Sequence, residues 1–238
     1  MNFINGGYYF SQGRKPPAWT NTALLPKVMW SVSHDVSYVF PDVWAFSTAT
    51  DAAKRKNKEF IDRLGLSANE FFEMGKFFDA LYFKKLCGFP YMIYDIPTAR
   101  LIYQRYLFRL ENLKLLGLGL PNTYFDEFVN ETIFPSQYLE SSLRYKVLKM
   151  DPPALDGNFL GFDILGYDGS FVPFTAQGFE TAFSQKLGIH LNIHGLIDSF
   201  DDAARALEYV KAHNPEEGVW FFWQVMEYTL ITSSRRSD

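Results

Sequence analysis

The apolar run VWFFWQVMEYTLIT at residues 219–232 constrains the fold of this chain more than any other segment. It is rich in Val, Trp and Phe, which favour an extended backbone, so it predicts a strand. A second run of similar character, NFLGFDILGY at residues 158–167, ends at the Asp-Gly pair 168–169, which is typical of a turn. The last third of the chain is therefore expected to contain two strands with a long connection between them.

That connection has the pattern of two helices. The segment TAQGFETAFSQKLG predicts a helix that stops at Gly188, because glycine readily adopts the left-handed conformation that ends helices. The segment SFDDAARALEYVKAHN predicts a second helix, with Ser199 as its N-cap and Asp202 three residues later. The second half thus reads as strand, helix, helix and strand.

The first half is expected to be mainly helical. Residues 51–65 predict a helix ended by Gly65, and Ser67 with Glu70 predicts a capping box that starts the next one. Pro97 opens a third predicted helix, which the glycines and the proline of LGLGLPN are expected to close. The segment SSLRYKVLKM is read as a strand.

This order of elements favours an α+β fold over a regular parallel alternation. Helices cluster in the first half, and the elements of the second half are expected to pack on a mostly antiparallel sheet. We expect one domain over residues 1–238, with a candidate subdivision at 151–158, where DPPALDGN combines paired prolines with an Asp-Gly turn.

The composition of the chain argues against binding to nucleic acid or to membranes. The formal net charge of −4 gives no general attraction to nucleic acid or anionic lipid, and no apolar stretch is long enough to span a bilayer. The single cysteine cannot form an intramolecular disulfide, and the N-terminus lacks the pattern of a signal peptide. We therefore expect a cytoplasmic protein that binds neither nucleic acid nor membranes.

Two histidines, His190 and His194, are four residues apart, a spacing that zinc enzymes use on helices. A helical zinc-protease motif needs Glu after the first histidine, but Leu191 stands there. Gly188 and Gly195 also argue against a helix through this segment. The sequence therefore predicts neither a metal site nor a cofactor.

Other catalytic motifs are equally incomplete. Cys87 follows Lys84 and Lys85, which could lower the pKa of a thiol, yet no thiol-protease signature surrounds it and a buried packing role is favoured. LGLGLPN lacks the third glycine of a dinucleotide fingerprint, and the basic run at residues 54–58 is diluted by neighbouring acids. No catalytic residue is predicted.

An acidic cluster is the strongest candidate for a binding surface. Residues 195–217 hold six acidic residues against two basic ones. Acids near a helix N-terminus also stabilise the helix dipole, so local stability explains some of them. As a docking surface, the cluster is expected to consist of Asp198, Asp201, Asp202 and Glu208, with Tyr209 as an aromatic anchor.

The segments LGFDILGYDGSF, LNIHGLID, DDAARALEYV and VWFFWQVMEY together resemble a pattern of small bacterial immunity-type proteins, covering roughly the last 80 residues. Such proteins are encoded beside polymorphic toxins or contact-dependent growth inhibition toxins. The resemblance implies a cytoplasmic, non-enzymatic protein that binds and neutralises a cognate toxin domain.

Two alternatives remain open at this stage. A hydrolase-like enzyme could use scattered residues, for instance His34 and Asp35 with His190 or His194. A homo-oligomeric structural module is the other alternative, and it would show a large self-complementary apolar surface.

Overall fold

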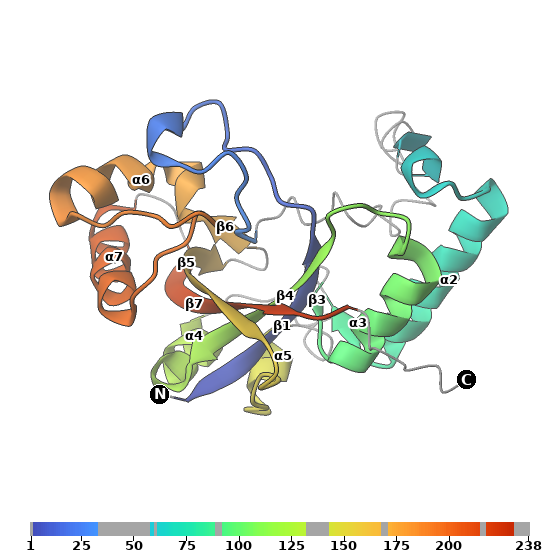
Figure 1. The fold of residues 1–238 in the computed structure, drawn as a ribbon. Coiled ribbons are helices and arrows are strands. Elements are labelled where there is room, and N and C mark those ends of the chain that lie inside the picture. Colours follow the sequence, from blue (N-terminus) through green and yellow to red (C-terminus); the bar gives the residue numbers. More distant parts are fainter. Residues whose placement is uncertain are drawn as a thin grey trace, which may run out of the picture.

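The computed structural model describes residues 2–32, 58–59, 61–88, 92–131, 143–167, 171–214 and 218–230. These residues form an α+β fold, as the sequence predicts, with helices packed on both faces of one seven-stranded sheet (Figure 1). Each pair of neighbouring strands is antiparallel, in the order β2-β3-β1-β4-β7-β5-β6. The strands are β1 (Phe3–Ser11), β2 (Cys87–Gly88), β3 (Met92–Ile93), β4 (Lys114–Pro121), β5 (Asn158–Tyr167), β6 (Phe171–Pro173) and β7 (Val219–Tyr228).

Several helices begin where local sequence signals place them. Ser67 and Glu70 form a reciprocal capping box at the start of α2, and Ser199 caps α7 through the backbone N–H of Asp202. The α-helices are α2 (Ala68–Phe83), α3 (Ile96–Ile102), α4 (Phe125–Glu131), α5 (Leu143–Val147), α6 (Phe179–Ala182) and α7 (Phe200–His213). The shorter helical turns are η1 (Thr22–Leu24), η4 (Tyr103–Leu107), η5 (Asn122–Tyr124), η7 (Phe174–Gln177) and η8 (Phe183–Leu187).

Strand β7 lies between β4 and β5 and supplies side chains to both faces of the sheet. Phe221 and Trp223 are fully buried on one face, and Phe222 and Tyr228 are buried on the other. The alternation follows from the two-residue period of a strand, so a run that is apolar at nearly every position needs cover on both sides.

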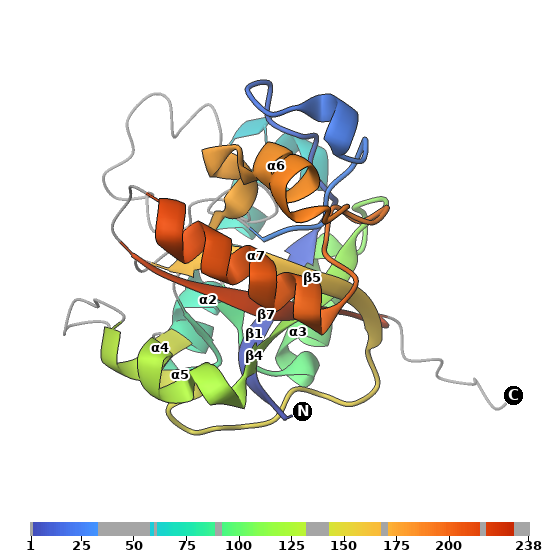
Figure 2. The same ribbon diagram turned by 90° about the vertical axis from the view of Figure 1, so that its left-hand side faces the viewer.

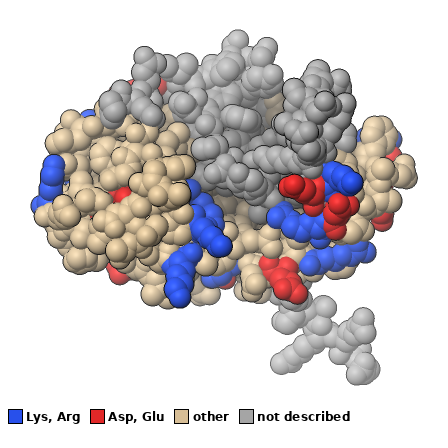
Figure 3. All heavy atoms as spheres, turned by 90° about the horizontal axis from the view of Figure 1, so that it is seen from above, with Lys and Arg blue, Asp and Glu red and all other residues tan. Residues whose placement is uncertain are grey.

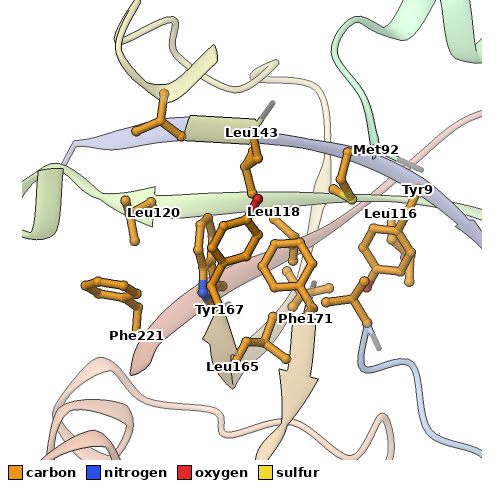
Figure 4. Close-up of a cluster of buried hydrophobic side chains, with 14 of the residues drawn as sticks. Tyr9, Met92, Leu116, Leu118, Leu120, Leu143, Leu165, Tyr167, Phe171 and Phe221 are labelled. Carbon is orange, nitrogen blue, oxygen red and sulfur yellow. The ribbon is translucent and has the colours of Figure 1, made fainter. Parts of the chain in front are cut away.

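One face of the sheet packs against α4 and α5. Phe128 of α4, together with Leu143 and Val147 of α5, is fully buried against leucines of β4 and aromatic residues of β7 and β5. Figure 4 shows Leu118, Leu143, Tyr167 and Phe171 converging in this layer. Ring contacts, such as the 5.6 Å edge arrangement of Phe128 and Trp223, fill the space between sheet and helices.

The opposite face carries two separate groups of helices. Helices α2 and α3 cover one end of it, and α6 and α7 cover the other, as Figures 1 and 2 show. Tyr228 packs in the first group, whereas Trp220 and Phe222 pack in the second. Because Trp220, Phe222 and Tyr228 are separated by even numbers of residues, they lie on the same face of β7, and this strand runs beneath both groups of helices.

Two predictions about local structure are wrong. The glycines of LGLGLPN do not close a helix, since residues 114–121 form β4, the central strand of the sheet, and helical structure after Pro97 ends at Leu107. Aromatic rings of neighbouring strands need the space above Gly117, so this glycine is a packing residue. The segment expected to be a strand, SSLRYKVLKM, contains α5 instead.

The connection at residues 151–157 lies against the sheet. The backbone N–H of Asn5 donates to the carbonyl of Asp151 at 2.7 Å. The Ala154 N–H donates to the Tyr8 hydroxyl, and the Tyr228 hydroxyl donates to the Ala154 carbonyl, both at 3.0 Å. Strands from both sides of this connection belong to the same sheet.

Candidate functional site

The predicted binding residues lie in and beside α7, which packs across the sheet (Figure 2). Its buried side consists of Ala203, Ala206, Leu207 and Val210, which spacing of three and four residues places on one helix face. This face packs against β5 and β7, so the opposite face is fixed in position and exposed to solvent.

Two of the predicted residues are engaged within the protein. Asp202 forms an ion pair with Arg205 at 2.7 Å, and the Ser199 hydroxyl also donates to its carboxylate. Tyr209 stacks on His213 with a centroid distance of 4.0 Å, and its hydroxyl accepts a hydrogen bond from the Lys186 ammonium at 2.8 Å. Asp202 and Tyr209 therefore have structural roles on the side of α7 that faces η8.

The other three predicted acids are exposed: Asp198, Asp201 and Glu208. Within the described residues, none of the three forms an ion pair. Asp198 accepts a hydrogen bond from the Asn192 amide at 2.7 Å, which leaves its charge in place. The predicted acidic surface is thus smaller than the sequence suggests, and these three residues carry its uncompensated charge.

The helix dipole does not account for an acidic residue at position 208. Asp201 lies in the first turn of α7, where a negative charge favours the helix dipole. Glu208 lies two turns further along, beyond the range of that effect. Burial, and then the charges of Glu208 and Glu127, raise the pKa of Tyr124, which places both acids near the start of α4.

Exposed apolar side chains adjoin this acidic surface. The turn before α7 is organised by Asn192, whose amide donates to the Leu160 carbonyl and to Asp198, and whose side-chain oxygen accepts from the His194 N–H. Ile193 in this turn is 80% exposed, and Phe159, next to Leu160, is 46% exposed. Sequence reasoning missed both, although an apolar residue inside an Asn-to-Gly turn is a recognisable signal of exposure.

The structure describes two of the four residues considered for a hydrolase-like site, His190 and His194. His190 is exposed in a segment without helix or strand, and His194 lies in the Asn192 turn, where its carbonyl accepts from the Trp30 N–H at 3.0 Å. His34 and Asp35 lie outside the described residues. In the part of the chain that the structure describes, no three His, Cys, Asp or Glu side chains gather as metal ligands would.

Cys87 is a packing residue, as predicted. It is 7% exposed in β2, and burial, with a smaller contribution from Asp79, raises the pKa of its thiol to about 12. A thiol with that pKa is protonated at neutral pH and is a poor nucleophile. The lysines that precede it in the sequence do not activate it.

A pocket of about 350 Å³ lies at the end of the sheet away from α7. Lys114 and Glu227 form an ion pair at 2.8 Å in its wall, so the charges of the two side chains offset each other. The lining residues are Tyr103, Leu113, Lys114, Asn158, Glu227, Tyr228, Thr229 and Leu230. None of the residues predicted for binding belongs to this pocket.

Charged side chains are unevenly distributed over the face of the molecule that Figure 3 shows. Seen from above, the α2 side shows acidic and basic side chains mixed together, whereas the α6 side shows mostly uncharged residues (Figure 3). Among the helices of the described residues, none has the length and apolar content needed to cross a bilayer.

Comparisons with known proteins give no further guide. No family model matches the chain, and neither the curated proteins nor the solved structures include a significant match.

Proposed function

We propose that this chain is a non-enzymatic, protein-binding protein that neutralises a bacterial toxin domain with a basic surface. The observation that carries the proposal is the placement of Asp201 and Glu208, exposed and without an ion pair in the described structure, on a helix held rigidly by the core. Asp198 extends this surface, and Ile193 adds an apolar contact beside it.

A surface of this kind suits a cationic partner. Many toxin domains are nucleases whose substrate clefts are basic, and carboxylates on a rigid helix can occupy the positions that phosphates would take. Opposite charges also accelerate association by steering the partners together at low ionic strength. The exposed Ile193 side chain would contribute apolar burial, which charge alone does not supply.

The sequence resemblance to immunity-type proteins supports the same function. It covers β5, the turn before α7, α7 itself and β7, which are the elements that build and support the acidic surface. The immunity role remains our proposal, and it makes α7 the first place to test.

The first experiment measures growth of cells that express the C-terminal domain encoded immediately upstream of this gene, with and without this protein. Growth arrest by the domain alone and rescue on co-expression would support the proposal. Copurification of the two proteins would then distinguish direct binding from an indirect effect. A harmless upstream domain, or rescue without any complex, would refute it.

Charge reversal tests the acidic surface itself. The double variant D201K/E208K should slow association with the toxin domain by about one to two orders of magnitude at low salt, because steering depends on these charges. Surface plasmon resonance at two salt concentrations measures this effect. D79K, which reverses an exposed acid on α2, is the matched control and should associate like the unmodified protein.

A further inference from the structure

Strand β5 contains a fully buried acid that sequence reasoning did not single out. Asp163 has an exposed fraction of 0% and follows Phe162 in a strand that is otherwise almost entirely apolar. Its cross-strand neighbour is Trp223, also fully buried. An ionised carboxylate in such surroundings is unfavourable unless donors and charges compensate it.

The contacts of Ser31 fit a neutral carboxyl on Asp163. Ser31 Oγ lies 2.5 Å from Asp163 Oδ2 and 3.2 Å from the Val32 carbonyl oxygen, but a hydroxyl has one hydrogen and cannot donate to both. When Asp163 is protonated, its O–H donates to Ser31 Oγ, and the Ser31 hydroxyl is free to donate to Val32. In the described structure, Asp163 Oδ1 has no hydrogen bond of ordinary geometry, so the backbone N–H groups of Ile164 and Val32 compensate a charge on this carboxyl only in part.

The groups that face this carboxyl keep their charge state across the neutral range. Burial raises the pKa of Asp163 to about 7, although Ser31, Arg14 and the nearby backbone of Ile164 and Val32 act in the opposite direction. Arg14 remains a cation and donates to the Thr175 hydroxyl at 3.2 Å. Tyr9 of β1 donates to the Trp30 carbonyl, and burial, followed by the charge of Asp163, raises the pKa of Tyr9 well above its ordinary value.

Ser31 belongs to a short segment, residues 29–32, that is attached to several parts of the fold. Met29 and Arg14 exchange backbone hydrogen bonds of 2.8 and 2.9 Å, and the Trp30 N–H donates to the carbonyl of His194. The Ser31 contact with Asp163 attaches this segment to β5. The segment therefore connects β1, β5 and the turn that precedes α7.

We propose that opening of residues 29–32 away from β5 is coupled to release of a proton from Asp163, so that the neutral carboxyl acts as a latch. The closed segment holds Asp163 in contact with Ser31 and away from water. Opening exposes the carboxyl, which then ionises as an ordinary aspartate does. This device is independent of toxin binding and goes beyond the proposed function.

The pKa of Asp163 differs between the closed and the open segment, and this difference sets the direction of the pH effect. An exposed aspartate has a pKa near 3.8, and the closed state raises it to about 7. The closed state is therefore most favoured below pH 4, and the advantage is lost as pH rises toward 7. The equilibrium constant for opening should increase about tenfold per pH unit, or about a thousandfold in total, and then level off.

Hydrogen exchange tests the latch directly. Protection factors of the amides of Trp30, Ser31 and Val32, corrected for intrinsic exchange, should fall steeply between pH 4 and pH 7 and stay constant above it. D163N carries a neutral side chain of similar shape and should show no such slope. D79N, which neutralises an exposed acid on α2, should retain the slope of the unmodified protein.

A slope in D163N equal to that of the unmodified protein would overturn the proposal, as would equal protection of the unmodified protein at pH 4 and pH 7. If D163N does not fold, the side-chain carboxyl of Asp163 can be titrated by carbon-13 NMR in the unmodified protein. A midpoint near pH 7 supports the latch, and a midpoint below about 5 refutes it.

Discussion

Replacing Gly117 by alanine should destabilise the fold more than a single methyl group suggests. A Cβ atom at this position would lie 2.7 Å from Tyr228 Cε2 and 2.9 Å from Tyr8 Cδ1, both far inside van der Waals contact. The two rings already meet edge to face at a centroid distance of 5.2 Å. The methyl group can therefore be accommodated only if at least one of these rings moves.

Neither ring can move freely, because both hydroxyls bind Ala154, one through its N–H and the other through its carbonyl. Overpacking of a dense core typically costs about 1–3 kcal/mol. Loss of one tyrosine hydrogen bond adds about 1 kcal/mol. We expect G117A to lower the free energy of unfolding by about 3 kcal/mol, measured by urea denaturation with circular dichroism and tryptophan fluorescence.

The matched control is G119A, two residues along the same face of β4. Its nearest neighbours would be Gln224 Oε1 at 3.1 Å, at the end of a flexible side chain, and Phe3 Cβ at 3.2 Å, which needs to shift by only a few tenths of an ångström. The cost should therefore be about 1 kcal/mol, clearly smaller than that of G117A. Equal losses in G117A and G119A would refute the reasoning. Combining G117A with Y228L should give less than the sum of the two separate losses, because the ring that obstructs the methyl group is gone.

Two further predictions concern local features. S199A removes the N-cap of α7, in which the Ser199 side chain accepts from the Asp202 N–H at 3.1 Å, and should lower the free energy of unfolding by about 1 kcal/mol. Thermal or urea unfolding measures this change, and an unchanged stability would show that the cap contributes nothing. Cys87 should resist alkylation by iodoacetamide at pH 8 in the folded protein and react readily in urea, because burial raises the pKa of its thiol to about 12. Rapid modification of the native protein, followed by mass spectrometry, would contradict this assignment.

The parts of the fold that sequence predicted correctly depend on neighbouring residues. The capping box of Ser67 and Glu70 and the cap at Ser199 form through side-chain and backbone groups three residues apart. Gly188 ends η8 in the left-handed conformation, with φ of +66°. The apolar runs at β5 and β7 are strands because their composition favours that backbone in any buried setting.

The wrong predictions concern segments whose structure depends on distant residues. Glycines normally weaken a strand, so LGLGLPN resembles a helix end, yet in β4 Gly117 makes room for the rings of Tyr8 and Tyr228 from the two adjacent strands. The sequence does not predict strand β1, because Gly6 and Gly7 interrupt its apolar pattern. The structure accommodates them at a shift in register between Asn5 and Tyr8.

The same distinction applies to the candidate site. Sequence by itself determined which acids surround α7, since they follow from the composition of one helix and its cap. The pairing of Asp202 with Arg205, three residues further along α7, is also a local contact. Only the tertiary structure decided that Lys186 of η8 donates to the Tyr209 hydroxyl and that Arg205 also donates to the Leu187 carbonyl. The tertiary structure also decided that Asp163, one of 27 acidic residues, is buried. Electrostatic environment depends on distance in space, and for residues far apart in the chain that distance exists only after folding.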